Sequence, residues 1–374
     1  MEGLGGTLEI RQPHPGTPVI DPAGTLCHNG RLDVPLSLEF GLGNCGTRPA
    51  ATKEIDMRNI GYGCAVTSFS LLLPLLAGCG GEHTAAPENA KPVIALIMKS
   101  LANEFFLTME NGAHAHHEAH ADAYELVAEG IKDELDVNRQ VQLVEQMMAR
   151  QVNAIVIAPA DSKALVPVCK RAIDAGIIVV NIDNKFDTEV LADRNVHIPF
   201  VGPDNRKGAR AVGDYLAKQL KRGDPVAIVG GVPSAFNAIE RRRGFEEAMK
   251  AAGMDIVISQ SGDWEMAKAN RVVAGMVTDR PDLKAILCAN DSMALGAVSA
   301  LRAAGKLDAV RVVGFDNISA VKELLQQGEV LATADQHADQ LAVFGIEFAL
   351  QMLREEGAPE DRETPVDLIA PGAN

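Results

Sequence analysis

The stretch AIVIAPADSKALVPVCKRAIDAGIIVVNIDNK, residues 154–185, decides the fold. It holds two continuously apolar runs, at 154–158 and 177–182, on either side of a segment with helical spacing at 163–174. A run that is apolar at every position is typical of a parallel strand buried on both faces, because a strand with one solvent-facing side alternates. The stretch therefore predicts a β-α-β unit with a right-handed crossover.

The same alternation continues in both directions along the chain. Further strands are predicted at 93–98, 124–128, 227–230, 256–259, 285–289 and 312–315, and helices at 104–121 and 137–150. The strands fall into two sets, which predicts an α/β fold of two doubly wound parallel-sheet lobes. Ligands in such sheets bind outside the carboxyl ends of the strands, so the residues that follow each strand are the candidates for a site.

Composition fits this architecture and limits the partners. The 374 residues are 47% hydrophobic and 23% charged, which is typical of a folded globular protein and long enough for two domains. Lys and Arg total 35 against 50 Asp and Glu, a formal charge of -15. Nucleic acids require a positive surface, so this balance argues against a nucleic-acid partner.

The first 78 residues are expected to lie outside the mature protein. Residues 1–56 show no sustained periodicity, and Met57 is the expected true start. Met57 is followed by Arg58 and an apolar run, the pattern of a secretory signal at 57–78. Pro74 interrupts that run, which is too short for a membrane span.

The end of this apolar run has a motif of its own. The sequence LAGC at 76–79 resembles the bacterial lipobox, which implies cleavage before Cys79 and lipidation of that cysteine. The polar, Gly-containing residues 79–91 are then a flexible tether. The lipid would be the only attachment to a membrane.

The other cysteines carry no evident chemistry. Cys27, Cys45 and Cys64 fall in the segment expected to be absent from the mature protein, and Cys169 and Cys288 lie in apolar patterns. The pattern predicts two free buried thiols, and no Cys or His spacing is typical of zinc.

A histidine cluster, His114 to His120, lies on the first predicted helix. His116 and His120 are four residues apart on one helix face, a spacing that is able to hold a transition metal. We expect this face at the solvent end of the helix, away from the strand ends, with exposed histidines and no metal.

Polar and aromatic side chains gather after the predicted strands. Amides, carboxylates and a guanidinium provide the paired donors and acceptors that a polyol needs, and a flat aromatic ring suits the apolar face of a sugar. No Ser/His or Cys/His pair and no Gly-rich phosphate loop is present, so neither an enzyme nor a cofactor is expected. The candidates are Lys99, Asn103, Phe105, Phe106, Asp183, Asn184, Arg241, Trp264, Asn290, Asp316 and Gln336.

Each candidate also has a purely structural alternative. A Phe pair at a helix start is often core, and Asp183, Asn290 or Asp316 could serve as helix N-caps. Trp264 could pack against the start of its helix. The neighbours Arg242 and Arg243 are expected on a solvated helix face.

Eight segments in order resemble a known family. They are KSLANEFFLTMENGA (99–113), IAPADSKAL (157–165), NIDNK (181–185), ERRRGFEEAM (240–249), GDWEMAKA (262–269), CANDSMALGA (288–297), VVGFDNI (312–318) and ATADQ (332–336). Across residues 91–369 the chain resembles type I periplasmic sugar-binding proteins of the ribose- and allose-binding group. The resemblance implies two lobes, joined by a three-segment hinge, that close over one monosaccharide and deliver it to an ABC importer.

The resemblance also carries site roles to this chain. It implies first-lobe contacts from Lys99, Asn103, Phe105, Phe106, Asp183 and Asn184, and contacts from the second lobe and hinge by Arg241, Trp264, Asn290, Asp316 and Gln336. It places the first lobe at 92–201 with 337–366, and the second at 202–336 with 367–374.

Three positions depart from the ribose-type pattern. Lys99 stands in place of a small hydroxyl residue and Ala158 in place of an amide, and both resemble the allose-type pocket. Asn184 replaces a charged residue that both patterns have. A hexose, a pentose and a sugar alcohol therefore all remain open as ligands.

Several functional classes are compatible with such lobes. A LacI-type repressor would carry a helix-turn-helix in front, whereas this chain has a signal-like segment and an acidic balance. An enzyme would need a nucleophile or a cofactor motif. The expected function is a monomeric, lipid-anchored periplasmic receptor that binds a monosaccharide or polyol and docks to an ABC permease. A receptor for chemotaxis or for a sensor kinase is the alternative.

Overall fold

The computed structural model describes residues 19–20, 26–27, 91–356 and 359–371. The chain divides into two compact units, Met1–Gly81 and Glu82–Asn374. In the first unit, β1 (Val19–Ile20) pairs antiparallel with β2 (Leu26–Cys27). The predicted signal peptide, Cys79 and nearly all of the predicted tether lie outside the described residues, so those predictions are untested.

The second unit begins with a six-stranded sheet in the order β13-β7-β6-β5-β3-β4, in which every neighbouring pair is parallel. Its strands are β3 (Val93–Ser100), β4 (Glu125–Ile131), β5 (Ala154–Ile157), β6 (Ile178–Ile182), β7 (Phe200–Pro203) and β13 (Arg362–Thr364). The helices of this lobe are α1 (Glu104–Ala119), α2 (Val137–Ala149), α3 (Val166–Asp174), α4 (Thr188–Asp193) and α10 (Ala338–Leu353).

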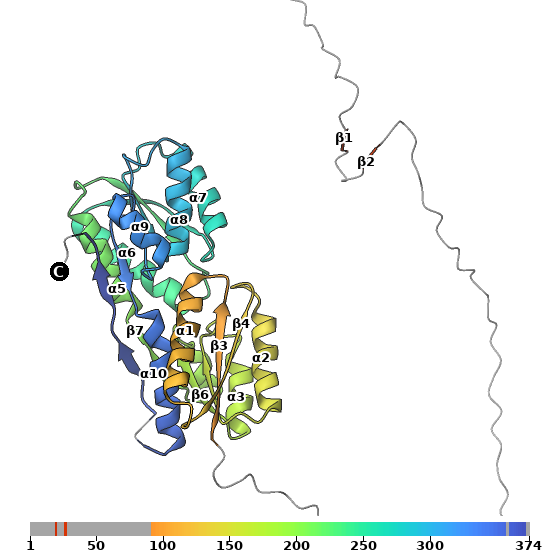
Figure 1. Ribbon diagram of the computed structural model, residues 1–374. Coiled ribbons are helices and arrows are strands. Elements are labelled where there is room, and N and C mark those ends of the chain that lie inside the picture. Colours follow the sequence, from red (N-terminus) through yellow and green to blue (C-terminus); the bar gives the residue numbers. More distant parts are fainter. Residues whose placement is uncertain (1–18, 21–25, 28–90, 357–358, 372–374) are drawn as a thin grey trace, which may run out of the picture. The chain divides into compact units, whose positions relative to one another are not determined.

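The continuous apolar runs of the inner strands β3, β5 and β6 have the predicted cause, because these strands are buried on both faces, whereas the edge strand β4 is mostly half-buried. In β3, Ile94, Leu96 and Met98 point into one core, whereas Ala95 and Ile97 point into another. Helices α1 and α10 pack together on one face of the sheet, and α2 and α3 pack together on the other (Figure 1). This arrangement confirms the predicted parallel, doubly covered sheet.

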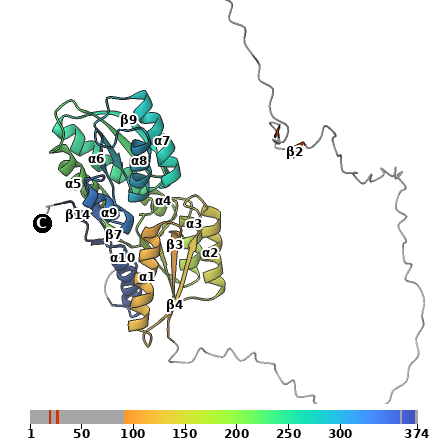
Figure 2. The same ribbon diagram turned by 45° about the horizontal axis from the view of Figure 1, so that its top comes forward.

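A second, four-stranded parallel sheet has the order β11-β10-β8-β9. Its strands are β8 (Pro225–Gly230), β9 (Asp255–Ser261), β10 (Ala285–Cys288) and β11 (Arg311–Val313). Around it lie α5 (Asn205–Ala217), α6 (Phe236–Ala252), α7 (Met266–Asp279), α8 (Asp291–Ala303) and α9 (Ser319–Gln327), as Figures 1 and 2 show. The two-lobed α/β prediction is confirmed.

The chain passes between the sheets three times: after β7, between β12 (Thr333–Asp335) and α10, and between β13 and β14 (Asp367–Ile369). Strands β12 and β14 pair antiparallel, and the bridge from Val313 to Ala332 joins β12 to the second sheet. The predicted boundary after residue 201 falls inside β7. The lobe boundaries themselves stay a prediction.

Predicted element ends differ from the structure where side chains or turns compete with the helix. The helix predicted from 163 begins at Val166, because Asp161 Oδ1 accepts hydrogen bonds from the backbone N–H groups of Lys163 and Ala164 in a turn. The helix predicted to 121 ends at Ala119, where the His120 N–H donates to His117 O instead.

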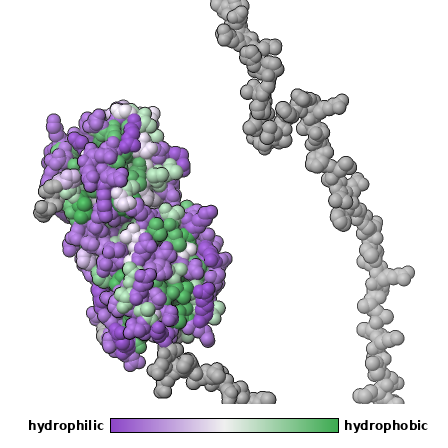
Figure 3. Space-filling view, in the orientation of Figure 1, coloured by the Kyte–Doolittle hydropathy of each residue, from purple (hydrophilic) through white to green (hydrophobic). Residues whose placement is uncertain are grey.

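The surface of the second unit is mostly hydrophilic on the face shown in Figure 3. No helix in the described part of the chain combines the length and the apolar character that crossing a membrane requires. Cys169 and Cys288 are free and buried, as predicted, and burial raises the pKa of Cys169 to about 12. Neither thiol is therefore a reactive group.

Candidate functional site

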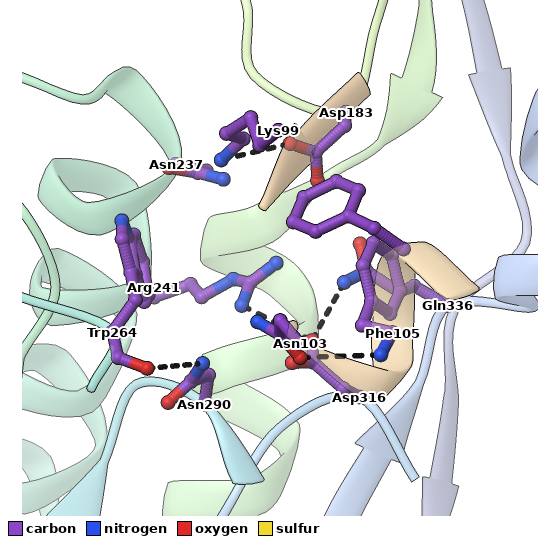
Figure 4. A pocket seen from close by; sticks show the side chains of 11 residues that line it. Lys99, Asn103, Phe105, Asp183, Asn237, Arg241, Trp264, Asn290, Asp316 and Gln336 are labelled. Atoms are coloured by element: carbon purple, nitrogen blue, oxygen red, sulfur yellow. Dashed lines mark hydrogen bonds and ion pairs between the residues drawn. The ribbon is translucent and has the colours of Figure 1, made fainter. Parts of the chain in front are cut away.

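A small cavity lies between the carboxyl ends of the two sheets. Eight of its eleven lining residues are polar or charged and three are aromatic, which suits a small polar ligand with an apolar face. Ten of the eleven residues that we predicted from the sequence line it (Figure 4). The lining consists of Lys99, Asn103, Phe105, Phe106, Asp183, Asn237, Arg241, Trp264, Asn290, Asp316 and Gln336.

Strand ends position most of this lining. Lys99 lies at the end of β3, Asp183 directly follows β6, and Gln336 directly follows β12. Because all of these strands stop at the edge that faces the other lobe, side chains far apart in the sequence meet in one cavity. This is the strand-end rule on which the sequence prediction relied.

Two asparagines of the lining are also helix N-caps. Asn103 Oδ1 accepts from the Phe105 N–H at the start of α1, and Asn290 Oδ1 accepts from the Met293 N–H at the start of α8. Asn290 is therefore a helix N-cap, as the structural alternative proposed, and its amide also borders the cavity. Each cap fixes its side chain, and the Asn290 Nδ2 also donates to Trp264 O at 3.4 Å, which ties the cap of α8 to the aromatic wall.

Three residues of the lining have a left-handed backbone. The φ angles are 59° at Asp183, 69° at Trp264 and 119° at Asp316. Non-glycine residues avoid this region, and such strain concentrates at functional sites, where it orients a side chain that the local fold would not. Neither carboxylate is a helix N-cap, so the structural alternative for Asp183 and Asp316 is wrong.

A buried ion-pair network forms the first-lobe wall. Lys99 Nζ lies 3.0 Å from Asp183 Oδ2 and 3.8 Å from Glu134 Oε2, and all three side chains are buried. Burial acts to lower the pKa of Lys99, but the two carboxylates outweigh it and raise that pKa above the usual value. The Lys99 ammonium is therefore charged and offers its protons to the cavity.

Arg241 organises the second-lobe wall. Its Nε donates to Asn205 Oδ1 at 2.7 Å, and its Nη1 donates to Ala289 O at 2.9 Å and to Asp316 Oδ1 at 3.3 Å. Asp316 Oδ1 also accepts from Gln336 Nε2 at 2.7 Å. Burial raises the pKa of Asp316 to about 7, and the Arg241 charge opposes that shift.

Two oxygens of the lining are buried acceptors that lack a donor. Within the described residues, Asn237 Oδ1 and Gln336 Oε1 have no hydrogen-bond partner, whereas Asp183 Oδ2 has the Lys99 ammonium 3.0 Å away. An unsatisfied buried acceptor costs about 1–3 kcal/mol. Two of them in one small cavity, beside the Asp183 carboxylate, indicate a ligand that donates several hydrogen bonds.

Aromatic rings provide the apolar part of the cavity. Phe105 and Phe106 meet edge to face, with their ring centroids 5.1 Å apart, and Trp264 belongs to the opposite lobe. The Lys99 ammonium lies 5.3 Å from the Phe106 centroid and 5.7 Å from that of Trp264. A flat ligand between the rings would bury its C–H faces while its edges meet the polar groups.

The sequence prediction was wrong for Asn184 and did not include Asn237. Asn184 does not line the cavity, because its Nδ2 donates to Pro159 O at 2.8 Å and its Oδ1 accepts from the backbone N–H of Asn237. Asn237 lines it instead. Asn237 lies four residues before Arg241, on the same face of α6, and this spacing was the signal that could have found it.

The adjacent arginines follow the prediction. Arg242 and Arg243 are exposed and pair with Glu246 and Glu240 on the same helix. Only Arg241 of the three lines the cavity.

The histidine cluster lies away from the cavity, as expected, but is not wholly exposed. His114 and His120 are exposed, whereas His116 is half-buried, because its Nδ1 contacts the Tyr124 hydroxyl at 2.9 Å. Burial lowers the pKa of His116. Within the described residues, no group of three or more His, Cys, Asp or Glu side chains is placed to hold a metal ion.

The sequence of this chain matches a family model and several known proteins. A family model described as "Periplasmic binding protein domain" matches residues 94–357. The chain is 56% identical over 321 residues to the D-ribose/D-allose-binding protein of Pseudomonas aeruginosa, covering 85% of this chain and 99% of that protein. It is 34% identical over 258 residues to the D-allose-binding periplasmic protein of Escherichia coli, covering 68% and 82%.

Solved structures agree with these matches. An ABC transporter solute binding protein from Burkholderia multivorans, with an unknown ligand built as alpha-D-erythrofuranose, is 59% identical with a TM-score of 0.74, covering 75% of this chain and 100% of that one. A periplasmic solute binding protein from Actinobacillus succinogenes with bound D-allose is 32% identical with a TM-score of 0.72, covering 75% and 98%.

Proposed function

The chain belongs to the periplasmic binding protein family, and on that premise we propose that its cavity binds one neutral monosaccharide for an ABC importer. The observation that carries this proposal is the pair of unpartnered acceptors, on Asn237 and Gln336, beside the Asp183 carboxylate in a single buried cavity. Sugar hydroxyls are donors of the right size and number for such a set. The chain is a binding protein and not an enzyme, in keeping with its relatives.

The charges in and around the cavity favour a neutral ligand over an anionic one. Lys99 and Arg241 are the cations, and each already faces carboxylates: Asp183 and Glu134 for Lys99, and Asp316 for Arg241. A sugar acid or sugar phosphate would add negative charge to a site whose cations are already paired. A neutral sugar instead accepts from Lys99 and Arg241 and donates to the carboxylates.

The relatives narrow the choice of sugar. Relatives of 56% and 34% identity are named for D-ribose and D-allose and for D-allose, and a solved relative of 32% identity holds D-allose. Lys99 and Ala158, which resemble the allose-type pocket, favour D-allose over D-ribose. We therefore propose D-allose first, D-ribose second, and other aldoses and polyols after these.

The family places the protein in the periplasm, where it meets the importer's permease. We extend this proposal to a monomer that is anchored by a lipid on Cys79, which lies outside the described residues. The 321-residue match to the Pseudomonas aeruginosa relative is longer than the described body of the chain, and so extends into the segment before Lys91. This supports a leader and tether as parts of the natural protein.

A thermal-shift screen tests the ligand proposal. The panel holds D-allose, D-ribose, D-glucose, D-galactose and myo-inositol, with D-gluconate and D-ribose 5-phosphate as charged controls. A ligand at one hundred times its Kd stabilises the folded state by about 2.7 kcal/mol, which raises the Tm of a protein of this size by roughly 4–5 °C. We expect a neutral sugar to do so and the charged controls to fail. A response to the charged compounds alone would overturn the proposal.

A further inference from the structure

Helix α6, which carries Asn237 and Arg241 into the cavity, lacks an N-cap side chain of its own. Its N-cap residue is Ala235, which has the extended backbone of a cap but no side-chain acceptor. The first N–H groups of a helix have no partner within the helix and require acceptors from elsewhere. The helices α1, α2, α4, α5 and α8 satisfy this need with an Asn or Asp at their own N-cap.

The acceptors for α6 come from the other lobe. Ser162 Oγ accepts from the Phe236 N–H at 2.9 Å, and Asn184 Oδ1 accepts from the Asn237 N–H at 3.2 Å. Ser162 lies in the loop after β5 and Asn184 in the loop after β6, so both belong to the first lobe. The cap of a second-lobe helix is therefore made across the interface between the lobes.

The capping pair is held rigidly. The Ser162 hydroxyl donates to Asn184 Oδ1 at 3.3 Å, and Asn184 Nδ2 donates to Pro159 O at 2.8 Å. Ser162 and Asn184 are 3% and 0% exposed, so water does not compete for these bonds. An amide is required at 184, since it accepts from α6 and donates to Pro159 at the same time.

The residue placed by this cap borders the ligand cavity. Asn237 is 2% exposed, its backbone N–H is bonded to Asn184, and its Oδ1 is, with Gln336 Oε1, one of two unpartnered acceptors of the lining. In Figure 4 its side chain lies close to Lys99, at the end of the cavity opposite Gln336. The lobe closure that forms the hydrogen bond between Asn184 and the Asn237 N–H therefore also positions the Asn237 amide at the cavity.

We propose that Ser162 and Asn184 are positioning residues, which cap α6 across the lobes and favour the closed form, and that Asn237 is a specificity-determining residue that binds a ligand hydroxyl. This inference rests on the proposed function. When the lobes separate, the Phe236 and Asn237 N–H groups exchange these acceptors for water. Part of the closing free energy therefore comes from contacts that never touch the ligand.

The test measures affinity by titration calorimetry with D-allose and D-ribose, or with the tightest-binding panel member and one epimer of it. Ser162→Ala and Asn184→Ala should each weaken binding roughly three- to tenfold, the scale of one net hydrogen bond, and equally for both sugars. Asn237→Ala should weaken the two sugars unequally. Asp136→Ala, which removes the cap of α2 within the first lobe, is the matched control and should leave affinity unchanged.

A converse variant separates closure from folding. Ala235→Ser gives α6 a cap of its own, so it should weaken ligand affinity without lowering the Tm of the unliganded protein. Wild-type affinity in Ser162→Ala, Asn184→Ala and Ala235→Ser would overturn the positioning role, and equal losses for both sugars in Asn237→Ala would overturn the specificity role. A wild-type protein that binds no monosaccharide would overturn the proposed function itself.

Discussion

The Trp264 ring packs against Gly231. The substitution Gly231→Ala is expected to weaken ligand binding by displacing that ring, although residue 231 does not line the cavity. A Cβ at residue 231 would lie closer than 3.0 Å to three atoms of the Trp264 ring. Ordinary carbon contacts are about 3.5–4.0 Å, so the ring has to move by roughly 1.5 Å. The adjacent Gly230→Ala is the matched control, because its Cβ would have Gln260 O at 3.9 Å as its nearest neighbour.

The magnitude follows from what the ring does in the cavity. Complete loss of a buried aromatic contact weakens binding by about 2–4 kcal/mol, so a displaced ring should lower the affinity at least tenfold, or about 1.4 kcal/mol. Overpacking should also destabilise the fold by about 1–3 kcal/mol. Because the chain has 1 Trp, its fluorescence reports on Trp264 alone. Gly231→Ala with wild-type affinity and an unchanged ligand-induced fluorescence signal would refute this account of the cavity.

Three further predictions concern charge and anchoring. Asp183→Asn should weaken sugar binding roughly 10- to 100-fold by calorimetry, because a charged acceptor is worth about 1.5–3 kcal/mol; a change below twofold would contradict this. Burial raises the pKa of Glu134 to about 7. Between about pH 4.5 and 7 the native state therefore holds more protons than the unfolded state. The free energy of unfolding should fall as the pH rises through that window. In urea titrations, the free energy of unfolding of Glu134→Gln should depend less on pH than that of the wild type, and Asp316 should account for the dependence that remains. The same pH dependence in Glu134→Gln and the wild type would contradict this prediction. Cys79→Ser should release the protein from the membrane fraction, and unchanged mass and fractionation would exclude the lipid anchor.

Much of the fold was predictable from local pattern. The strands β3, β5, β6 and β10 are continuous apolar runs because both of their faces are buried, and burial on both faces is a direct consequence of a parallel sheet. Element ends were less predictable. The start of α3 depends on a turn stabilised by the Asp161 carboxylate, which competes with helix formation on nearly equal terms.

The site was predictable where strand ends determine it, and less so where the lobes meet. Lys99 lies at the end of a strand, and Asp183 and Gln336 directly follow strands, so topology alone brings them together. Asn184, which we predicted in the cavity, instead caps helix α6 of the other lobe. Asn237, which belongs to α6, lines the cavity. Such a pairing depends on two segments far apart in sequence, and one chain's local pattern does not specify it.

The most direct test of the central claim is a calorimetric titration of the wild-type protein with D-allose, followed by mass spectrometry of the recovered ligand. Lys99, Asp183 and Arg241 line one cavity and pair their charges with one another or with neighbouring carboxylates, an arrangement suited to a neutral ligand. The account predicts one ligand per chain, a Kd in the micromolar range or tighter, and a sugar that is recovered unaltered. Absence of binding by D-allose and by every other neutral member of the panel, or conversion of the sugar, would contradict it.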